Sequence, residues 1–279
     1  MLPFRIPLGW VTIGPMEAGT LLGVALAAVL ARRRLDPPGV PWGGLLDLAL
    51  GALIGGAVGA RLFHAVPAWV RGPAALEFAG DAWSSGSGIY GGLAGGALGL
   101  LLTARWKGLP VLRALDAAAS VAPAAFALGK LGCFLAGCCY GRPCGVPPGV
   151  RFGPGSLAFQ TQQARGLLPA GAASSQPVHP AQLYELAFGV ALFAGLSVLR
   201  RRSGRPGETA LVFALLYSAW RFGIEFLRDD PGRHGFGAAG LTDSQIAAIV
   251  AGGAALAAWI RLRFRKGGPA GATKGPASA

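Results

Sequence analysis

The chain has 279 residues, of which 53% are hydrophobic and only 13% are charged, and its formal net charge is +13. Soluble domains carry roughly 25% charged residues, so this composition excludes an ordinary soluble globular protein. The basic residues cluster beside apolar runs, as membrane topology requires, so we expect an all-α polytopic membrane protein and no nucleic-acid partner.

Seven apolar runs predict about seven transmembrane helices, each near the ~20 residues that a bilayer core needs. They lie at 9–31, 44–66, 87–104, 111–138, 180–199, 208–227 and 242–260. We therefore interpret residues 1–266 as a single transmembrane domain. The low-complexity tail at 267–279 is expected to be disordered.

The basic residues also predict an orientation. They are most frequent after the first, third, fifth and seventh runs, and the other connections hold about half as many. These four connections share one side of a seven-span protein, and the positive-inside rule makes that side cytoplasmic. We therefore expect the N-terminus outside and the C-terminus in the cytoplasm.

The longest connection, residues 140–178, is rich in Gly, Pro, Ser and Gln. It is too long for a plain linker, and we interpret it as a small extracytoplasmic lid. Within it, Val150-Arg-Phe and Leu157-Ala-Phe are expected to form short strands or turns.

Five ionisable residues in the predicted spans carry the functional argument: Arg61, Lys130, Glu185, Arg221 and Glu225. A charge at membrane depth costs roughly 2.5–3.5 kcal/mol on insertion scales, so it marks a functional site by default. Three cations and two carboxylates leave one surplus positive charge, which suits an anionic ligand such as a phosphodiester headgroup. The alternative is a set of internal ion pairs, because Arg221 and Glu225 are spaced i, i+4 on one helix.

The segment His179-Pro-Ala-Gln-Leu-Tyr-Glu185 opens the fifth run. Pro180 fits the first helical position, where no amide hydrogen is needed, and Gln182 is expected to fold back onto the helix start. A helix N-terminus at the outer interface suits a phosphate. A plain polar helix start with an interfacial Tyr184 would explain the same residues.

The segment from Ser87 to Gly96 opens the third run and is rich in glycine. A bare helix-packing face is the commoner meaning of such glycines, here including Gly91 and Gly92. Tyr90 adds a phenol beside them. The segment 241–245 opens the seventh run with residues suited to capping.

The four cysteines have the spacing C-x4-C-C-x4-C, which matches no strong zinc or iron–sulfur signature. We therefore expect no metal. A disulfide from Cys138 or Cys139 to Cys144 would tie the lid to its helix. Inert buried thiols are the alternative, and this is the interpretation we favour for Cys133.

Taken together, these stretches resemble the prolipoprotein diacylglyceryl transferase family, and the resemblance runs through nearly the whole chain. It is most specific in residues 179–185 and in Tyr217-x-x-x-Arg221-Phe. The segment from Gly129 to Gly141 matches the family signature at five positions: a cation at Lys130, and Gly132, Phe134, Gly137 and Gly141. Arg61 also lies where the family has an arginine.

Four positions depart from the family pattern. Where this chain has Lys130 and Tyr90, the family usually has arginine and histidine. Where it has Cys133 and Cys138, the family usually has asparagine and glutamate. Lysine holds a phosphate as a point charge, without the bidentate fork of arginine. The family histidine is a candidate proton acceptor, so Tyr90 leaves two interpretations open. Either another base serves the reaction, or the chain is a divergent paralogue with altered substrate or lost activity.

The resemblance implies an enzyme of lipoprotein biosynthesis in the bacterial inner membrane. The family moves a diacylglyceryl group from phosphatidylglycerol to the lipobox cysteine thiol of a secreted prolipoprotein, and no cofactor or metal is required. Phosphatidylglycerol, the prolipoprotein signal peptide and membrane lipid are the expected partners. Two rival hypotheses are a lipid-binding paralogue without thiol chemistry and an anion transporter, although the sequence shows no inverted repeats.

Candidate site residues follow from the resemblance and from their chemistry. The candidate catalytic residues are Arg221, Lys130, Tyr90 and His179. The candidate substrate-binding residues are Arg61, Tyr217, Gln182, Tyr184, Glu185, Gly91, Gly92 and Gly141. The cations would stabilise the departing phosphate. Tyr90, His179 and Glu185 would handle the proton or hold the headgroup.

Overall fold

The structure is a computed structural model, and it describes residues 6–8, 11–34, 42–71, 88–145, 147–202, 205–229, 235–236 and 240–264. The tail that was expected to be disordered, residues 267–279, lies outside the described residues.

Long helices make up most of the described chain, and each predicted apolar run corresponds to one of them. They are α1 (Pro15–Arg34), α2 (Trp42–Arg71), α4 (Gly88–Trp106), α5 (Val111–Ala136), α7 (Ala181–Arg202), α8 (Glu208–Ile224) and α9 (Asp243–Phe264). A short helix, α6 (Leu157–Ala164), lies in the lid. Two small antiparallel hairpins pair β1 (Ile6–Leu8) with β2 (Val11–Ile13) and β3 (Gly235–Phe236) with β4 (Leu241–Thr242). The all-α fold is thus confirmed.

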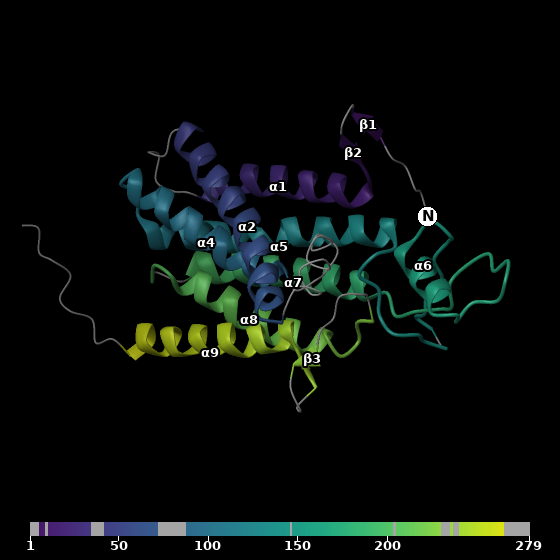
Figure 1. Ribbon diagram of the computed structural model, residues 1–279. Coiled ribbons are helices and arrows are strands. Elements are labelled where there is room, and N and C mark those ends of the chain that lie inside the picture. The colour runs from purple at the N-terminus through teal and green to yellow at the C-terminus, as the bar shows by residue number, and fades with distance from the viewer. Residues whose placement is uncertain are drawn as a thin grey trace, which may run out of the picture.

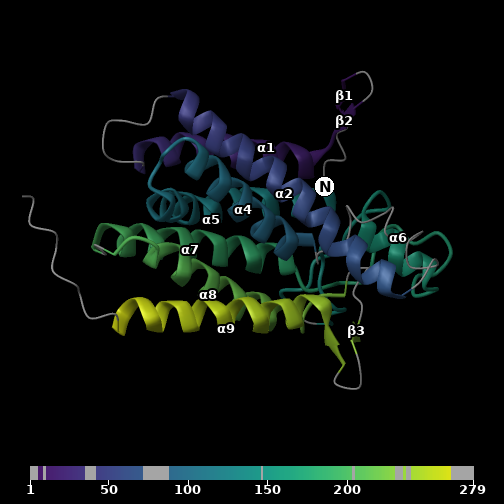
Figure 2. The ribbon, with the colours of Figure 1, turned by 60° about the vertical axis from the view of Figure 1, so that its left-hand side comes forward.

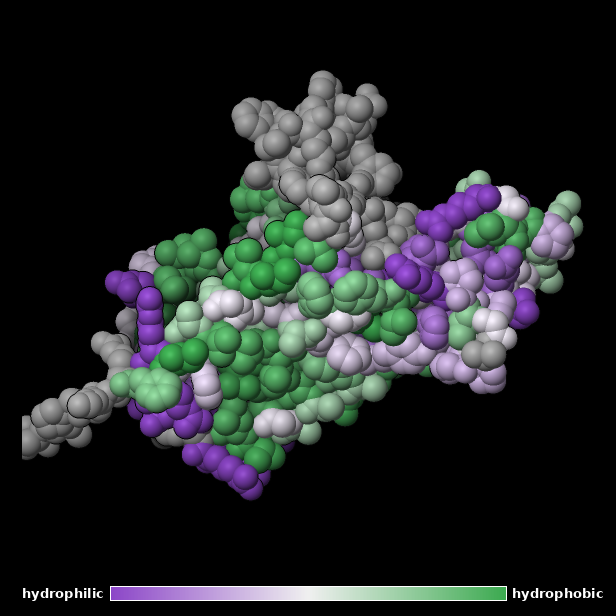
Figure 3. Space-filling view, turned by 90° about the horizontal axis from the view of Figure 1, so that it is seen from below, coloured by the Kyte–Doolittle hydropathy of each residue, from purple (hydrophilic) through white to green (hydrophobic). Residues whose placement is uncertain are grey.

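The surface of the bundle is suited to lipid. Helices α1, α2, α5, α7 and α9 are each long and apolar enough to cross a membrane. Helix α4 has 19 residues and contains several glycines. Helix α8 has 17 residues, close to the length that a bilayer core needs. Large apolar side chains face outward, such as Leu22, Ile54 and Val250, each about two-thirds exposed. On the face in Figure 3, a largely hydrophobic band lies between hydrophilic ends. The protein is therefore a multi-pass membrane protein.

Glycines bring two helix pairs into backbone contact. Between α2 and α4, a Cβ atom added to Gly55 would lie 2.3 Å from the carbonyl oxygen of Gly95. Between α1 and α5, one added to Gly19 would lie 2.7 Å from the carbonyl oxygen of Leu128. Both views of the ribbon place α1 and α9 at opposite edges, with α5 and α7 between them (Figures 1 and 2). The glycine-rich composition therefore serves close helix packing, as predicted.

Ion pairs and caps fasten the end of the bundle far from the lid. The Asp116 carboxylate accepts backbone hydrogen bonds from Gly207 (2.7 Å) and Ala210 (2.9 Å) at the start of α8. Lys107 Nζ lies 2.6 Å from Asp47 Oδ2. These carboxylates hold helix ends, so they belong to the scaffold.

The lid, residues 140–178, is an ordered unit with its own small core. The backbone of Val178 pairs with Val150, and Tyr140, Phe152, Ala158 and Val178 pack together as buried side chains. The expectation of a strand or turn at Leu157-Ala-Phe is wrong, because α6 begins there. The Ser156 hydroxyl caps this helix by accepting a 3.1 Å hydrogen bond from the Phe159 amide.

Gly141 is the point at which three distant segments meet. Its amide donates to the His179 carbonyl oxygen (2.9 Å), and it forms an antiparallel bridge with Arg228. A Cβ atom here would lie 2.7 Å from both His179 Cβ and the Leu227 carbonyl oxygen, so only glycine fits. The lid is thereby fixed to the start of α7 and to the segment after α8.

Candidate functional site

Lys130 is buried near the end of α5, and it does not reach out to an interface. Its Nζ atom lies 2.6 Å from Glu185 Oε2 on α7 and 5.3 Å from the centre of the Phe126 ring. Only 8% of Lys130 and 1% of Glu185 are exposed. A buried lysine needs such a partner, because an isolated charge is costly to remove from water.

A second cation approaches the same carboxylate from the segment after α8. Arg228 Nη1 lies 3.7 Å from Glu185 Oε1, and both side chains are buried. Glu185 therefore lies between two cations that come from different parts of the chain. This position for Arg228 depends on the backbone bridge at Gly141.

The third buried cation is Arg221 on α8. Its Nη1 atom pairs with Glu225 one turn later, as the i, i+4 spacing predicted, and its Nη2 atom donates to Ser244 Oγ at 3.1 Å. Ser244 lies in the first turn of α9, where Thr242 and Gln245 exchange reciprocal capping hydrogen bonds of 3.0 and 3.3 Å. The cap of α9 thus positions a ligand of the guanidinium.

Among the described residues at the lid end, three cations and two carboxylates are buried: Lys130, Arg221, Arg228, Glu185 and Glu225. We call these five residues the charged cluster. The formal surplus of the charged cluster is one positive charge. The sequence analysis also expected a surplus of one, but it counted Arg61 in the group and did not include Arg228. Arg61 is exposed on α2, so it is not one of these buried cations, and its role in substrate binding stays a prediction.

Tyr217 joins the charged cluster to an apolar cavity. Its buried side chain lies in the electrostatic field of Lys130, Glu185 and Arg221. Its hydroxyl has no hydrogen-bond partner among the described residues. The Tyr90 ring meets it edge-on, with centroids 6.1 Å apart. A buried polar atom without a partner is costly, so this position suits a bound polar ligand.

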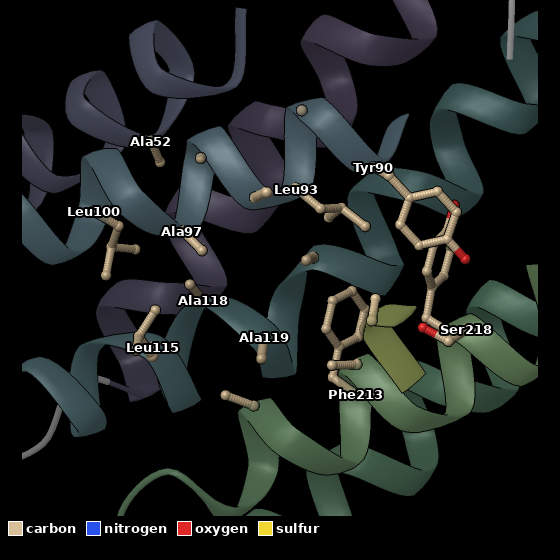
Figure 4. A pocket seen from close by; sticks show the side chains of 18 residues that line it. Ala52, Tyr90, Leu93, Ala97, Leu100, Leu115, Ala118, Ala119, Phe213 and Ser218 are labelled. Carbon is tan, nitrogen blue, oxygen red and sulfur yellow. The ribbon is translucent and has the colours of Figure 1, made fainter. Parts of the chain in front are cut away.

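The cavity has a volume of about 390 Å³ and lies between α2, α4, α5, α8 and α9. Figure 4 shows Tyr90 and Ser218 at one end and Leu100 and Leu115 at the other, with alanines between them. Apart from the groups at the tyrosine end, its lining is apolar and made mainly of small side chains. Such a cavity suits a hydrocarbon chain.

Comparison with known proteins gives matches that cover most of the chain, from α1 to α9. The chain matches the prolipoprotein diacylglyceryl transferase family over residues 16–261. A phosphatidylglycerol–prolipoprotein diacylglyceryl transferase of Nitratidesulfovibrio vulgaris is 32% identical over 260 residues, which cover 88% of this chain and 91% of the relative. A protein of the same name from Pseudomonas fluorescens is 29% identical over 279 residues, covering 93% and 95%. The chain belongs to the prolipoprotein diacylglyceryl transferase family.

In this family member, the motif at residues 179–185, which opens α7, departs from our expectation for Gln182. Gln182 does not fold back onto its own helix, because its Nε2 atom donates to the Cys138 carbonyl oxygen at 2.5 Å. It thus ties the start of α7 to the end of α5. Its Oε1 atom is buried and has no hydrogen-bond partner among the described residues.

His179 and Tyr184 form a pair, with Nδ1 of the imidazole 3.2 Å from the phenol oxygen. Both are partly buried, whereas Glu185 points into the charged cluster. Successive residues on a helix face different directions, so only Glu185 faces the other buried charges.

The predicted glycines have different roles in the structure. Gly91 lies in the seam between α2 and α4, where an added Cβ would be 2.2 Å from the Gly59 carbonyl oxygen. Gly92 lines the apolar cavity and has more room. Gly141 joins the lid to α7. Only Gly92 therefore has a direct relation to the cavity in which we expect lipid.

All four cysteines are described, and no disulfide joins them. Cys133, Cys138 and Cys139 have their sulfur atoms within 4.8 Å of one another, so the pairing expected with Cys144 is wrong. Helix α5 ends in a Schellman motif, in which the Cys138 amide donates to the Cys133 carbonyl oxygen at 3.2 Å. This turn folds the chain back and gathers the sulfurs.

Proposed function

We propose that this protein transfers the diacylglyceryl group of phosphatidylglycerol to the cysteine thiol of a prolipoprotein. The observation that carries the proposal is a buried cluster with one surplus cation that adjoins an apolar cavity. A phospholipid has the matching form, because its phosphate is anionic and its acyl chains are apolar. Tyr217 lines the cavity and lies one turn of α8 before Arg221, so in this proposal it marks the boundary between phosphate and hydrocarbon.

The phosphate would lie at Arg221 and Lys130. Arg221 follows Tyr217 by one turn of α8, and Lys130 Nζ lies 5.3 Å from the ring of Phe126, which packs edge-on against Tyr217. Both cations therefore lie near Tyr217. The hydroxyl of Tyr217 and the amide oxygen of Gln182 provide further polar groups there. Only the tyrosine hydroxyl of these two can donate to an anion, whereas the amide oxygen can accept from the glycerol hydroxyls of the headgroup.

The reaction then follows from this arrangement. The thiolate of the prolipoprotein attacks the glyceryl carbon that carries the phosphate oxygen, a carbon–sulfur bond forms and the carbon–oxygen bond breaks. Glycerol phosphate leaves with the electron pair. Arg221 and Lys130 stabilise the negative charge that develops on this leaving group, and their effect is strong because water is excluded.

The thiol must lose its proton before or during the attack. His179, Glu185 and Tyr90 are our candidates for accepting it or for holding the headgroup. His179 is the strongest of these in the structure, because its imidazole lies outside the ion pairs of the charged cluster and Tyr184 orients it. Glu185 is held between Lys130 and Arg228, which stabilise it as a carboxylate.

We place the protein in the bacterial inner membrane, with the N-terminus outside and the C-terminus in the cytoplasm. The arginine-rich ends of α7 and α9 support this orientation. The lid and the charged cluster then face the outer leaflet, where a secreted prolipoprotein would present its lipobox cysteine.

The test is transfer of a labelled diacylglyceryl group from phosphatidylglycerol to a lipobox peptide by the purified full chain. We expect a mass increase on the peptide that equals one diacylglyceryl group, and no increase when the peptide cysteine is replaced by serine. Failure of the chain both in this assay and in rescuing a strain depleted of its own transferase would contradict the proposal.

A second candidate is a paralogue that binds or modifies phospholipid without thiol transfer. Tyr90 favours it, because this phenol packs among apolar residues with Tyr217 and Ala248. A tyrosine phenol keeps its proton at neutral pH, so it is a poor proton acceptor. Binding of phosphatidylglycerol by the chain without any mass increase on the peptide would select this second candidate.

A further inference from the structure

The three clustered sulfurs have no role in the transfer reaction that we propose, since lipid and prolipoprotein supply the reacting atoms. They nevertheless form a compact group. Each of Cys133, Cys138 and Cys139 offers one Sγ atom, and these atoms lie within 4.8 Å of one another. Ligands around one metal ion are spaced in this way, because metal–sulfur bonds are about 2.3 Å long.

The backbone is shaped to gather these sulfurs. Cys139 has a φ angle of 56°, which is uncommon for a residue other than glycine. In an extended chain, neighbouring side chains point in opposite directions. The left-handed turn at Cys139 instead lets Cys138 and Cys139 converge on Cys133 in the last turn of α5.

A fourth sulfur arrives from another helix. Cys138 Sγ lies 4.0 Å from the thioether sulfur of Met16 at the start of α1. This approach requires tight contact between α1 and α5, because a Cβ atom on Gly132 would lie only 2.4 Å from the Pro15 carbonyl oxygen. Helix packing thus places a thioether next to three thiols.

The surroundings also suit negatively charged ligands. Lys130 and Arg228 both act electrostatically on Cys139. Thiols bind metals as thiolates and release their protons when they do so. Three thiolates around a monovalent cation would carry two negative charges, and Lys130 and Arg228, which share Glu185, would offset part of that charge.

We propose that Cys133, Cys138 and Cys139, with Met16 as a weaker fourth ligand, form a binding site for Cu(I). Thiolate and thioether ligands select soft metal ions, and Cu(I) is the soft ion that uses both. Zinc usually takes four ligands from cysteine, histidine and carboxylate. Among the described residues, no histidine or carboxylate oxygen joins this group of sulfurs. The site does not depend on the transferase activity.

The experiment uses the full chain, reduced and purified in detergent without oxygen. Cu(I) is supplied from its complex with bicinchoninate, and the protein-bound copper is measured after gel filtration. We expect one Cu(I) per chain for the unmodified protein and for Cys144→Ser, whose cysteine lies outside the group. X-ray absorption should show sulfur neighbours only.

Cys139→Ser should lower the affinity for Cu(I) at least ~10-fold, and Cys138→Ser should do the same in case the first variant folds poorly. The Cu(I) affinities are compared only between preparations that elute as a single, monodisperse peak in gel filtration. Equal binding by Cys144→Ser and both of these variants would overturn the site. Displacement of bound Cu(I) by equimolar Zn(II), or oxygen or nitrogen neighbours in the absorption spectrum, would overturn the assignment to copper.

Discussion

At the scale of single residues, Arg221 shows how neighbouring side chains hold a buried charge in place. Glu225 and Ser244 take up its guanidinium from two helices, so the side chain has little freedom. Arginine presents a planar fork that can hold several oxygens at once, which a lysine ammonium cannot do. The shape of this side chain should therefore matter as well as its charge.

We predict that Arg221→Gln lowers diacylglyceryl transfer by at least ~30-fold. Removal of a buried, hydrogen-bonded charge costs about 2–5 kcal/mol, and about 1.4 kcal/mol corresponds to a tenfold change in rate. Arg221→Lys should be impaired less, because it keeps the charge and loses only the fork. The measurement is the rate of transfer from labelled phosphatidylglycerol to a lipobox peptide.

Arg165→Gln is the matched control, since this arginine is 43% exposed in the lid and pairs with Asp229 on the surface. Surface pairs contribute little, so its activity should stay near that of the unmodified protein. Near-normal transfer by Arg221→Gln would contradict a role in phosphate binding and would leave Arg221 only its ion pair with Glu225.

Arg228 gives a second prediction. Arg228→Gln should also lower transfer, because it leaves Glu185 with one cation and removes the surplus charge of the cluster. We expect a loss of at least ~30-fold, from a cost of about 2 kcal/mol or more. Arg142→Gln, an exposed arginine of the same lid junction, is the control. Equal rates for the two variants would show that Arg228 has a purely structural role or none.

The sequence predicted a buried surplus charge, and it identified Lys130, Glu185, Arg221 and Glu225 because ions within apolar runs stand out. It missed Arg228, which follows the last apolar residues of α8. A backbone bridge pairs this arginine with Gly141 of the lid, and pairing between distant segments has no local signal. Arg61 stood out in the same way as the others, yet it is exposed.

At the scale of elements, the glycine seam between α2 and α4 determines how closely these helices approach. Backbone atoms form most of the seam, because carbonyl oxygens of one helix face glycine Cα atoms of the other. A small increase in volume must therefore move a whole helix.

We predict that Gly91→Ala destabilises the protein, since the new Cβ would lie 2.2 Å from the Gly59 carbonyl oxygen. Overpacking of this kind costs about 1–3 kcal/mol. Gly253→Ala, in α9 with nothing within 4 Å of the added Cβ, should be neutral or slightly stabilising. Thermal unfolding in detergent measures both variants. An unchanged midpoint for Gly91→Ala would mean that the seam can open without cost.

Hydrophobic runs were sufficient to predict every long helix, because length and apolar composition determine a membrane span. The lid was harder to predict. Helix α6 has polar residues and only eight positions, and its start depends on the Ser156 cap. Short segments of this kind take their structure from the core they cover, which is formed here by Tyr140, Phe152 and Val178.

At the scale of the whole molecule, the two ends of the bundle differ in chemistry. The lid and the charged cluster occupy one end, and α9 ends at the other (Figure 1). The last turns of α7 and α9 are rich in arginine. This polarity provides a test of orientation.

In a cysteine-free chain, we predict that Arg202→Cys is not labelled from outside intact cells by a membrane-impermeant maleimide. Ala170→Cys, in an exposed part of the lid, should be labelled. Both positions should react after the membrane is permeabilised. Labelling of Arg202→Cys in intact cells would reverse the orientation that the positive-inside rule predicts.

If phosphatidylglycerol binds at the charged cluster as we propose, its binding is coupled to the folding equilibrium. A ligand that binds only the folded protein raises its unfolding free energy, by about 2.7 kcal/mol at a hundred times the dissociation constant. The unfolding temperature in detergent should therefore rise as phosphatidylglycerol is added, and less with zwitterionic phosphatidylcholine. Arg221→Gln removes the surplus and should lose this response, whereas Arg165→Gln should keep it. Phosphatidylglycerol would then be both the substrate of this protein and a determinant of how long it survives outside the membrane.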